Sequence, residues 1–174
     1  MIKAGIIGAT GYAGVELVRI LLRHPQAQLQ AVSSVSFEGQ ALEEVYPALS
    51  GLCGLRCVTA EQVVEESDVI FAALPHGLSQ ETAKACADAG KKFIDLGADF
   101  RLDDPEDYTA WYGCEVRYPA LHQRAVYGLP ELFREKETVG ISGASASEWE
   151  QAAMLSHEFK TPLTVVLSSL QLLR

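Results

Sequence analysis

A glycine-rich segment placed directly after a short apolar run constrains the fold of this chain more than any other feature. Residues 2–7 (IKAGII) have the composition of a buried strand, and residues 8–14 read GATGYAG. Residues 14–24 then place valine and leucine at helical spacing before Pro25. A strand, a glycine turn and a helix in that order are typical of a dinucleotide-binding α/β unit.

The three glycines of this segment have separate expected roles. Gly8 permits a tight turn, Gly11 lets the backbone approach a pyrophosphate, and Gly14 lets helix and strand pack closely. The N–H groups and the positive dipole end of the following helix favour phosphate. The alternative is a tight turn with three glycines and no ligand.

The rest of the first 140 residues alternates between strand and helix patterns. Such alternation predicts right-handed crossovers and a doubly wound, mostly parallel, Rossmann-like α/β sheet. Strands are expected at 28–34, 55–58, 68–74 and 92–97, and helices at 60–67 and at 79–90, the latter opening with Ser79 as its cap and stopping at Gly90.

The pattern changes near residue 140. Residues 141–147 are small and typical of a linker, so we expect a domain at 1–140, a junction, and a separate piece at 148–174. We expect no strand in this last piece, but a C-terminal amphipathic helix that could pair with a copy of itself. Its apolar seam lies within 152–173 and consists of Ala152, Leu155, Phe159, Leu163, Val166, Leu170 and Leu173.

Composition narrows the function classes. The formal charge of −9 and the absence of a Lys/Arg cluster argue against nucleic acid. The longest apolar stretch, Val69–Leu74, is far too short to cross a membrane, and the first residues do not resemble a signal peptide, so we expect a cytoplasmic protein. No metal site is expected, because Cys53, Cys57, Cys86 and Cys114 lack the spacing of a zinc set.

The end of the second expected strand bears on the choice of cofactor. NAD-binding proteins usually carry a carboxylate there, whereas this chain has Ser33 and Ser34. Hydroxyl groups do not repel a 2′-phosphate, so NADP is favoured over NAD.

Four ordered segments resemble one enzyme family: GATGYAGVEL (8–17), ALPHGLS (73–79), IDLGADFRL (94–102) and YGLPEL (127–132). Residues 1–140 are similar to the N-terminal part of the N-acetyl-γ-glutamyl-phosphate reductases, members of the semialdehyde dehydrogenase superfamily. The resemblance implies NADPH-dependent reduction of an acyl phosphate to a semialdehyde, through a cysteine thioester, in arginine biosynthesis. It implies cofactor contacts from Gly8, Thr10, Gly11, Tyr12, Ala13, Gly14, Ser33, Ser34, Leu74, Pro75, His76 and Gly77.

Three departures from the family pattern stand out. Val35 replaces an arginine suited to the 2′-phosphate, and Gly97 replaces a serine. Ala144 stands where the catalytic cysteine is expected, and alanine cannot form a thioester. The substrate domain of the family is also missing from the sequence, so we expect a cofactor-binding piece that is inactive as a reductase by itself.

Residues 156–164 (SHEFKTPLT) resemble a different family, the phosphoacceptor helix of histidine kinases. The resemblance implies that His157 accepts a phosphoryl group and that Glu158 assists, with Thr161 linked to dephosphorylation and Pro162 kinking the helix. His157 would face away from the apolar seam. The alternatives to the reductase reading are therefore a phosphorelay fragment of two-component signalling, joined to a truncated reductase, and a non-catalytic self-associating protein.

The remaining polar and aromatic residues are weaker candidates. We expect His24 and His122 to be solvated, and His76 to serve the cofactor site or the structure rather than act as a base. The charged loop that follows residue 98 has two possible interpretations, a substrate-side role and a solvated turn. It contains Asp99, Arg101, Asp103 and Asp104. We expect core or interface positions for Trp111 and Tyr112.

Overall fold

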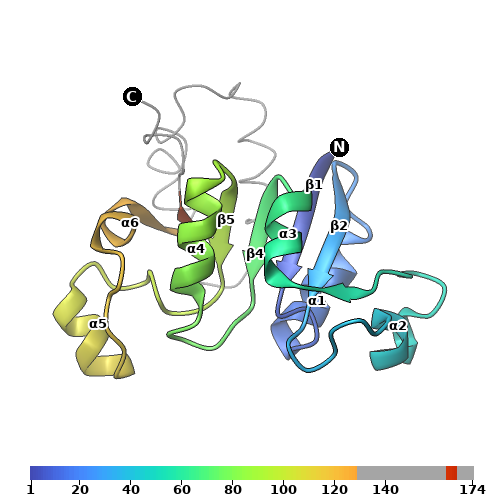
Figure 1. The fold of residues 1–174 in the computed structure, drawn as a ribbon, viewed down its shortest axis with the longest axis horizontal. Helices are drawn as coiled ribbons and strands as arrows, with labels where there is room; N and C mark the ends of the chain where they lie inside the picture. Colours follow the sequence, from blue (N-terminus) through green and yellow to red (C-terminus); the bar gives the residue numbers. More distant parts are fainter. Residues whose placement is uncertain (129–163, 168–174) are drawn as a thin grey trace. The chain divides into compact units, whose positions relative to one another are not determined.

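The structure is a computed structural model that describes residues 1–128 and 164–167 (Figure 1). Contacts within the chain divide it into two compact units, Met1–Ala73 and Leu74–Arg174. The two units are described separately.

The first unit is a parallel sheet. Its strand order is β3-β2-β1-β4, and every pairing in it is parallel. The strands are β1 (Ile2–Ile7), β2 (Ala27–Ser33), β3 (Cys57–Val58) and β4 (Val69–Ala72). All four residues of β4 are buried, as expected for a central strand covered on both faces.

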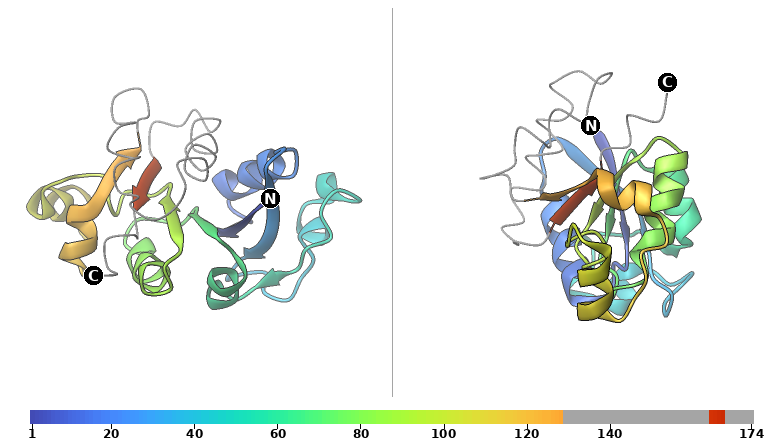
Figure 2. Two further views of the ribbon diagram at one scale, coloured as in Figure 1. Left: turned by 90° about the horizontal axis from the view of Figure 1, so that it is seen from above. Right: turned by 90° about the vertical axis from the view of Figure 1, so that its left-hand side faces the viewer.

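Helices α1 (Tyr12–Leu21) and α3 (Ala60–Glu66) cover opposite faces of this sheet, as Figure 2 shows. Helix α3 approaches closely because β1 carries Gly5. A side chain at Gly5 would overlap Ser67 and come within 2.5 Å of Val63. Two short helical turns, α2 (Leu42–Val45) and η1 (Pro47–Leu49), follow β2.

The second unit combines helices with an antiparallel set of strands. Strand β7 pairs with both β5 and β6, and both pairings are antiparallel. The elements are α4 (Ser79–Asp88), β5 (Lys92–Asp95), α5 (Pro105–Tyr112), α6 (Pro119–Arg124), β6 (Ala125–Gly128) and β7 (Thr164–Leu167).

The predicted α/β, Rossmann-like class is confirmed, but the expectation about the tail was wrong in one place. We expected no strand within 148–174, whereas Thr164–Leu167 form β7. The segment reads TVVL, and its β-branched residues favour a strand, where they pack well on a pleated surface. The rest of the expected helix, with most of its seam, lies outside the described residues.

Two single-residue expectations also need correction. His24 and His122 are buried, not solvated. The Nδ1 atom of His24 accepts the N–H groups of Gln26 and Ala27 and so closes the turn before β2. Of the core and interface positions expected for Trp111, the core is excluded, because the residue is 79% exposed and α5 turns Tyr108 inward instead; the interface stays a prediction.

The described part of the chain contains no helix that is both long enough and apolar enough to cross a membrane.

Candidate nucleotide-binding site

The turn after β1 has the geometry that its glycines predict. Gly8 has a φ of 85°, in the left-handed region that glycine adopts without strain. The N–H groups of Gly8 and Ala9 both donate to the carbonyl oxygen of Ser33, at 3.1 and 2.9 Å. These bonds fix the turn to the end of β2.

Gly14 and Gly11 differ in the space around them. A Cβ at Gly14 would overlap the carbonyl oxygen of Gly8 and lie 2.7 Å from Cα of Ala9, so only glycine allows α1 to approach the turn. A Cβ at Gly11 would meet only the Gly8 oxygen, at 3.5 Å, an ordinary contact. The conformational roles expected for Gly8 and Gly14 are therefore present, while the space at Gly11 is open.

The first turn of α1 offers unused donors. Gly11 is the N-cap residue and supplies no side-chain hydrogen bond. The N–H groups of Tyr12, Ala13 and Gly14 have no partner within the helix, because the first turn of any α-helix lacks one. The turn carries no acidic residue, and Tyr12 is 95% exposed. This helix end can therefore accept an anion from solvent.

Two predicted site residues from different elements are brought together beside the turn. The hydroxyl groups of Thr10 and Ser34 lie 2.6 Å apart and share a hydrogen bond. Ser33 and Ser34 are buried, whereas the Val35 side chain that follows is 97% exposed.

Tyr46 was missed by the sequence analysis. Its hydroxyl donates to the carbonyl oxygen of Thr10 at 2.6 Å, so it holds the glycine turn from the side of α2. The two residues are separated by 36 positions. No sequence pattern joins them.

The second predicted group, Leu74–Gly77, forms a turn in the second unit. Leu74 is half-buried, while Pro75 and His76 are exposed. Gly77 has a φ of 84°, and a side chain there would meet the Cys114 sulfur at 2.9 Å. The His76 ring lies 5.6 Å from the ring of Tyr112, centre to centre.

Asp99, in the charged loop, is not solvated, and a substrate-side role for it stays a prediction. It is fully buried and accepts the N–H groups of Gly77 (2.5 Å) and Ser79 (2.9 Å) and the hydroxyl of Tyr108 (2.8 Å). We expected the Ser79 side chain to cap α4, but it does not. Its N–H is satisfied by Asp99, and its hydroxyl donates to Asp95.

The other charged residues of this loop have local roles. Asp103 and Asp104 are exposed, as a solvated turn predicts. Asp104 caps α5 by accepting the N–H of Glu106. Arg101 donates to the Tyr112 hydroxyl and to the Gly97 carbonyl oxygen.

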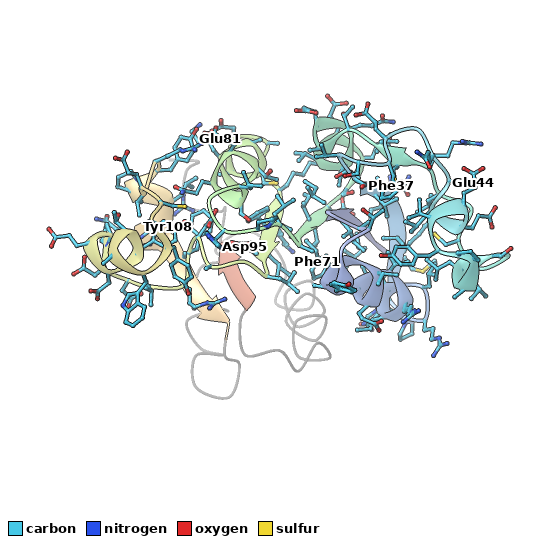
Figure 3. All side chains as sticks on the ribbon, turned by 90° about the horizontal axis from the view of Figure 1, so that it is seen from below. Phe37, Glu44, Phe71, Glu81, Asp95 and Tyr108 are labelled. Atoms are coloured by element: carbon cyan, nitrogen blue, oxygen red, sulfur yellow. The ribbon has the colours of Figure 1, made fainter. Side chains whose placement is uncertain are left out.

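Asp95, labelled in Figure 3, is a second fully buried carboxyl group. Its Oδ1 atom accepts the Ser79 hydroxyl at 2.8 Å and the Gly97 N–H at 2.9 Å. Its Oδ2 atom is buried and has no hydrogen-bond partner among the described residues. Burial raises the pKa of Asp95 to about 6, against the lowering effect of these two donors.

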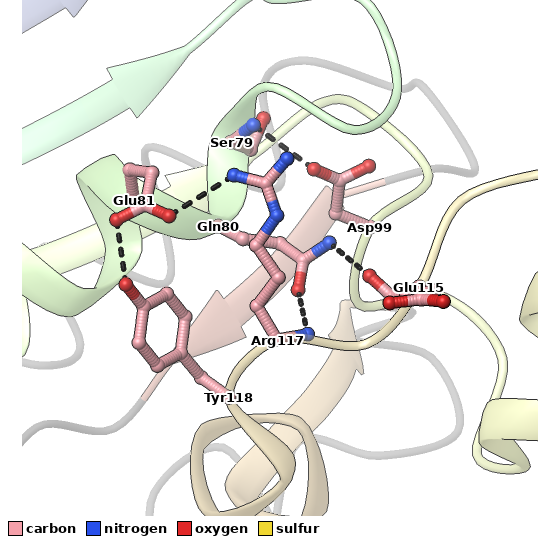
Figure 4. A network of polar contacts seen from close by, with 7 residues as sticks. All are labelled: Ser79, Gln80, Glu81, Asp99, Glu115, Arg117 and Tyr118. Carbon is pink, nitrogen blue, oxygen red and sulfur yellow. Dashed lines mark hydrogen bonds and ion pairs between the residues drawn. The ribbon is translucent and has the colours of Figure 1, made fainter.

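Helix α4 also holds the segment that follows α5 (Figure 4). The buried amide of Gln80 donates to the Glu115 carbonyl oxygen at 2.9 Å and accepts the Arg117 N–H at 2.7 Å. The Glu81 carboxylate accepts hydrogen bonds from the Tyr118 hydroxyl and the Arg117 guanidinium, and these two bonds lower the pKa of Glu81.

Several predicted residues are not placed. Ala144, His157 and Glu158 lie outside the described residues, so their roles stay predictions. All four cysteines are free thiols. Within residues 1–128 and 164–167, no group of three histidine, cysteine or acidic side chains is arranged to hold a metal ion.

A parallel sheet, a left-handed glycine turn and an uncapped helix N-terminus together define a dinucleotide-binding protein of the Rossmann-like α/β class. Residues 3–138 match the family described as "Semialdehyde dehydrogenase, NAD binding domain", and the chain belongs to this family.

Curated relatives agree with the family. The chain is 54% identical, over 136 residues, to the N-acetyl-gamma-glutamyl-phosphate reductase of Clostridium botulinum (strain Eklund 17B / Type B). This match covers 78% of this chain and 40% of that protein. It is 48% identical over 134 residues to the enzyme of the same name from Brachyspira hyodysenteriae, covering 77% of this chain and 38% of the relative. The chain therefore spans about 40% of the length of these relatives.

Among solved structures, the chain is similar to aspartate semialdehyde dehydrogenase with NADP from Candida albicans. The TM-score is 0.53 at 21% identity, and the match covers 60% of this chain and 32% of that one. At this identity the similarity supports the fold alone.

Proposed function

We propose that this chain binds NADPH as the nucleotide-binding part of an N-acetyl-γ-glutamyl-phosphate reductase, with the cytoplasm as the expected compartment. The observation that carries the proposal is the helix end at Gly11, which has free N–H groups, no cap and no acidic neighbour. The relatives that are identical to it at about half of the aligned residues are reductases of this name. In such an enzyme the cofactor supplies the hydride, and the residues of this chain hold and orient it.

The preference for NADPH over NADH rests on the end of β2. The hydroxyl groups of Thr10 and Ser34 form a neutral pair there, and Ser33, Ser34 and Val35 include no carboxylate. A carboxylate at this position binds the ribose of NAD and repels a 2′-phosphate. Because neutral hydroxyls can donate to phosphate oxygens, we propose a contact between the Ser34 hydroxyl and the 2′-phosphate.

We propose that residue 144 supplies no catalysis. Thioester formation requires a thiolate, and Ala144 has none. The chain should therefore bind the cofactor without reducing an acyl phosphate through this position.

Calorimetric titration of the full chain with NADPH tests the proposal, with NADH as the comparison ligand. We expect saturable binding of NADPH that is tighter than that of NADH. Gly11→Val should abolish the binding, because the turn tolerates a Cβ but the phosphates then meet the added side chain.

Gly54→Val is the matched control, since a Cβ at Gly54 meets nothing within 4 Å and the residue is exposed. We expect this variant to bind NADPH like the original chain. A folded chain that does not bind NADPH, or a Gly11→Val variant that binds as well as the original, would show that the proposal is wrong.

The resemblance of residues 156–164 to a phosphoacceptor helix lies beyond the matched residues 3–138 and outside the described residues. Phosphorylation of His157 and self-association through 152–173 stay predictions from the sequence.

A further inference from the structure

We infer that Asp99 is a positioning residue for cofactor binding: its buried carboxylate sets the conformation of the turn Leu74–Gly77. This inference rests on the proposed function. It adds a role for a residue that belongs to neither the glycine turn nor the expected set of cofactor contacts.

The Asp99 carboxylate binds two backbone amides at once. Oδ1 accepts the Gly77 N–H at 2.5 Å, and Oδ2 accepts the Ser79 N–H at 2.9 Å. The two oxygen atoms thus hold two amides of one turn, on either side of Leu78. A carboxylate that accepts backbone N–H groups makes charge-assisted hydrogen bonds, which are about twice as strong as neutral ones.

Among the described residues, the other hydrogen bonds of this turn are weaker. Leu78 is the N-cap residue of α4 and makes no side-chain cap, and within the turn the Leu78 N–H reaches the Pro75 oxygen only at 3.3 Å. Gly77 has a left-handed backbone conformation. Because glycine has access to many other backbone conformations, its surroundings must select this one. Asp99 therefore supplies from a distant loop the cap that the sequence of α4 lacks.

Asp99 is itself held in place by burial and by Tyr108. Its exposed fraction is 0%, and the Tyr108 hydroxyl donates to its Oδ1 at 2.8 Å. Tyr108 comes from α5, and its hydroxyl shares the Oδ1 atom with the Gly77 N–H. Because Asp99 already occupies the N-terminus of α4, that helix end is closed to an anionic ligand, and the effect of Asp99 on a cofactor is exerted through the turn.

Asp99→Asn is the decisive variant. The amide keeps the size of the side chain but places an N–H₂ group against one of the two backbone N–H groups, so one of them loses its acceptor. We expect the Kd for NADPH to rise at least about tenfold, the change that corresponds to about 1.4 kcal/mol. Tyr108→Phe removes the supporting hydroxyl but leaves both backbone bonds, so the Kd for NADPH should rise less than it does in Asp99→Asn.

A stability control separates positioning from general loosening. Phe93→Leu shortens a buried side chain of β5 and should lower the melting temperature without changing the Kd for NADPH. The inference is supported if Asp99→Asn loses affinity while Phe93→Leu, at an equal or larger loss of melting temperature, does not. It is overturned if Asp99→Asn binds like the original chain, or if both variants lose affinity in proportion to stability.

Amide hydrogen exchange on the original chain decides the case in which Asp99→Asn fails to fold. The Gly77 and Ser79 amides should exchange slowly in the free protein and more slowly still with saturating NADPH. Unchanged exchange of both amides on NADPH binding would overturn the inference. Absence of NADPH binding by the original chain would instead refute the proposed function, which distinguishes the two failures.

Discussion

Asp95 should make the protein less stable as the pH rises from acid to neutral, and Asp95→Asn should remove that dependence. The carboxyl group is fully buried, and its Oδ2 atom has no hydrogen-bond partner among the described residues. Loss of its proton therefore places a charge in a buried site. The Ser79 hydroxyl and the Gly97 N–H, both at Oδ1, and the charge of Arg101 stabilise it, while the charge of Asp99 opposes it.

The magnitude follows from the shift in pKa. Burial raises the pKa of Asp95 from 3.8 to about 6 in the folded chain. Between these values the folded chain binds more protons than the unfolded chain, so the free energy of unfolding falls as the pH rises. A difference of about two pKa units corresponds to a loss of about 3 kcal/mol in the free energy of unfolding. This loss is complete above about pH 6 and absent below about pH 4.

Chemical unfolding of the full chain and of Asp95→Asn, measured from about pH 4 to pH 8, tests this reasoning. Other titrating groups contribute to both proteins, so the difference between the two curves isolates Asp95. We expect the variant to gain stability relative to the original chain as the pH rises, approaching about 3 kcal/mol less the cost of an unpaired amide N–H.

Asp107→Asn is the matched control, because this carboxyl group is exposed on α5. Its effect should stay within about 0.5 kcal/mol at every pH. A difference between Asp95→Asn and the original chain that does not vary with pH, or that favours the original chain at neutral pH, would refute the reasoning.

Three further substitutions test the glycine turn and its surroundings. Gly14→Ala should lower the free energy of unfolding by about 3 kcal/mol, because its Cβ overlaps backbone atoms; a loss below about 1 kcal/mol in chemical unfolding would contradict the packing. Tyr46→Phe should cost about 1 kcal/mol of stability by removing the bond to the Thr10 oxygen, and an unchanged unfolding midpoint would argue against that bond. Val35→Arg should tighten NADPH about tenfold and leave NADH unchanged in calorimetry, because the exposed position lets a guanidinium reach a 2′-phosphate; equal gains for Val35→Gln would show that charge is not the cause.

The sequence by itself determined the parts of this protein that depend on neighbouring residues. Gly8 and Gly14 could be assigned their conformational roles because a left-handed turn and a close helix contact are set within a few residues of the chain. The buried run that forms β4 was evident for the same reason, since hydrophobic patterns are local.

Tertiary structure decided the contacts between distant segments. It joined Tyr46 to Thr10 across 36 positions and Asp99 to Gly77 across 22. It also placed Thr164–Leu167 in a strand where the spacing of apolar residues predicted a helix. A buried aspartate and an exposed one look alike in a charged stretch of sequence. They differ in whether the fold brings hydrogen-bond donors from distant segments to the carboxylate. Periodicity reports on the burial of a face, whereas a hydrogen bond between remote residues exists only once both have been placed.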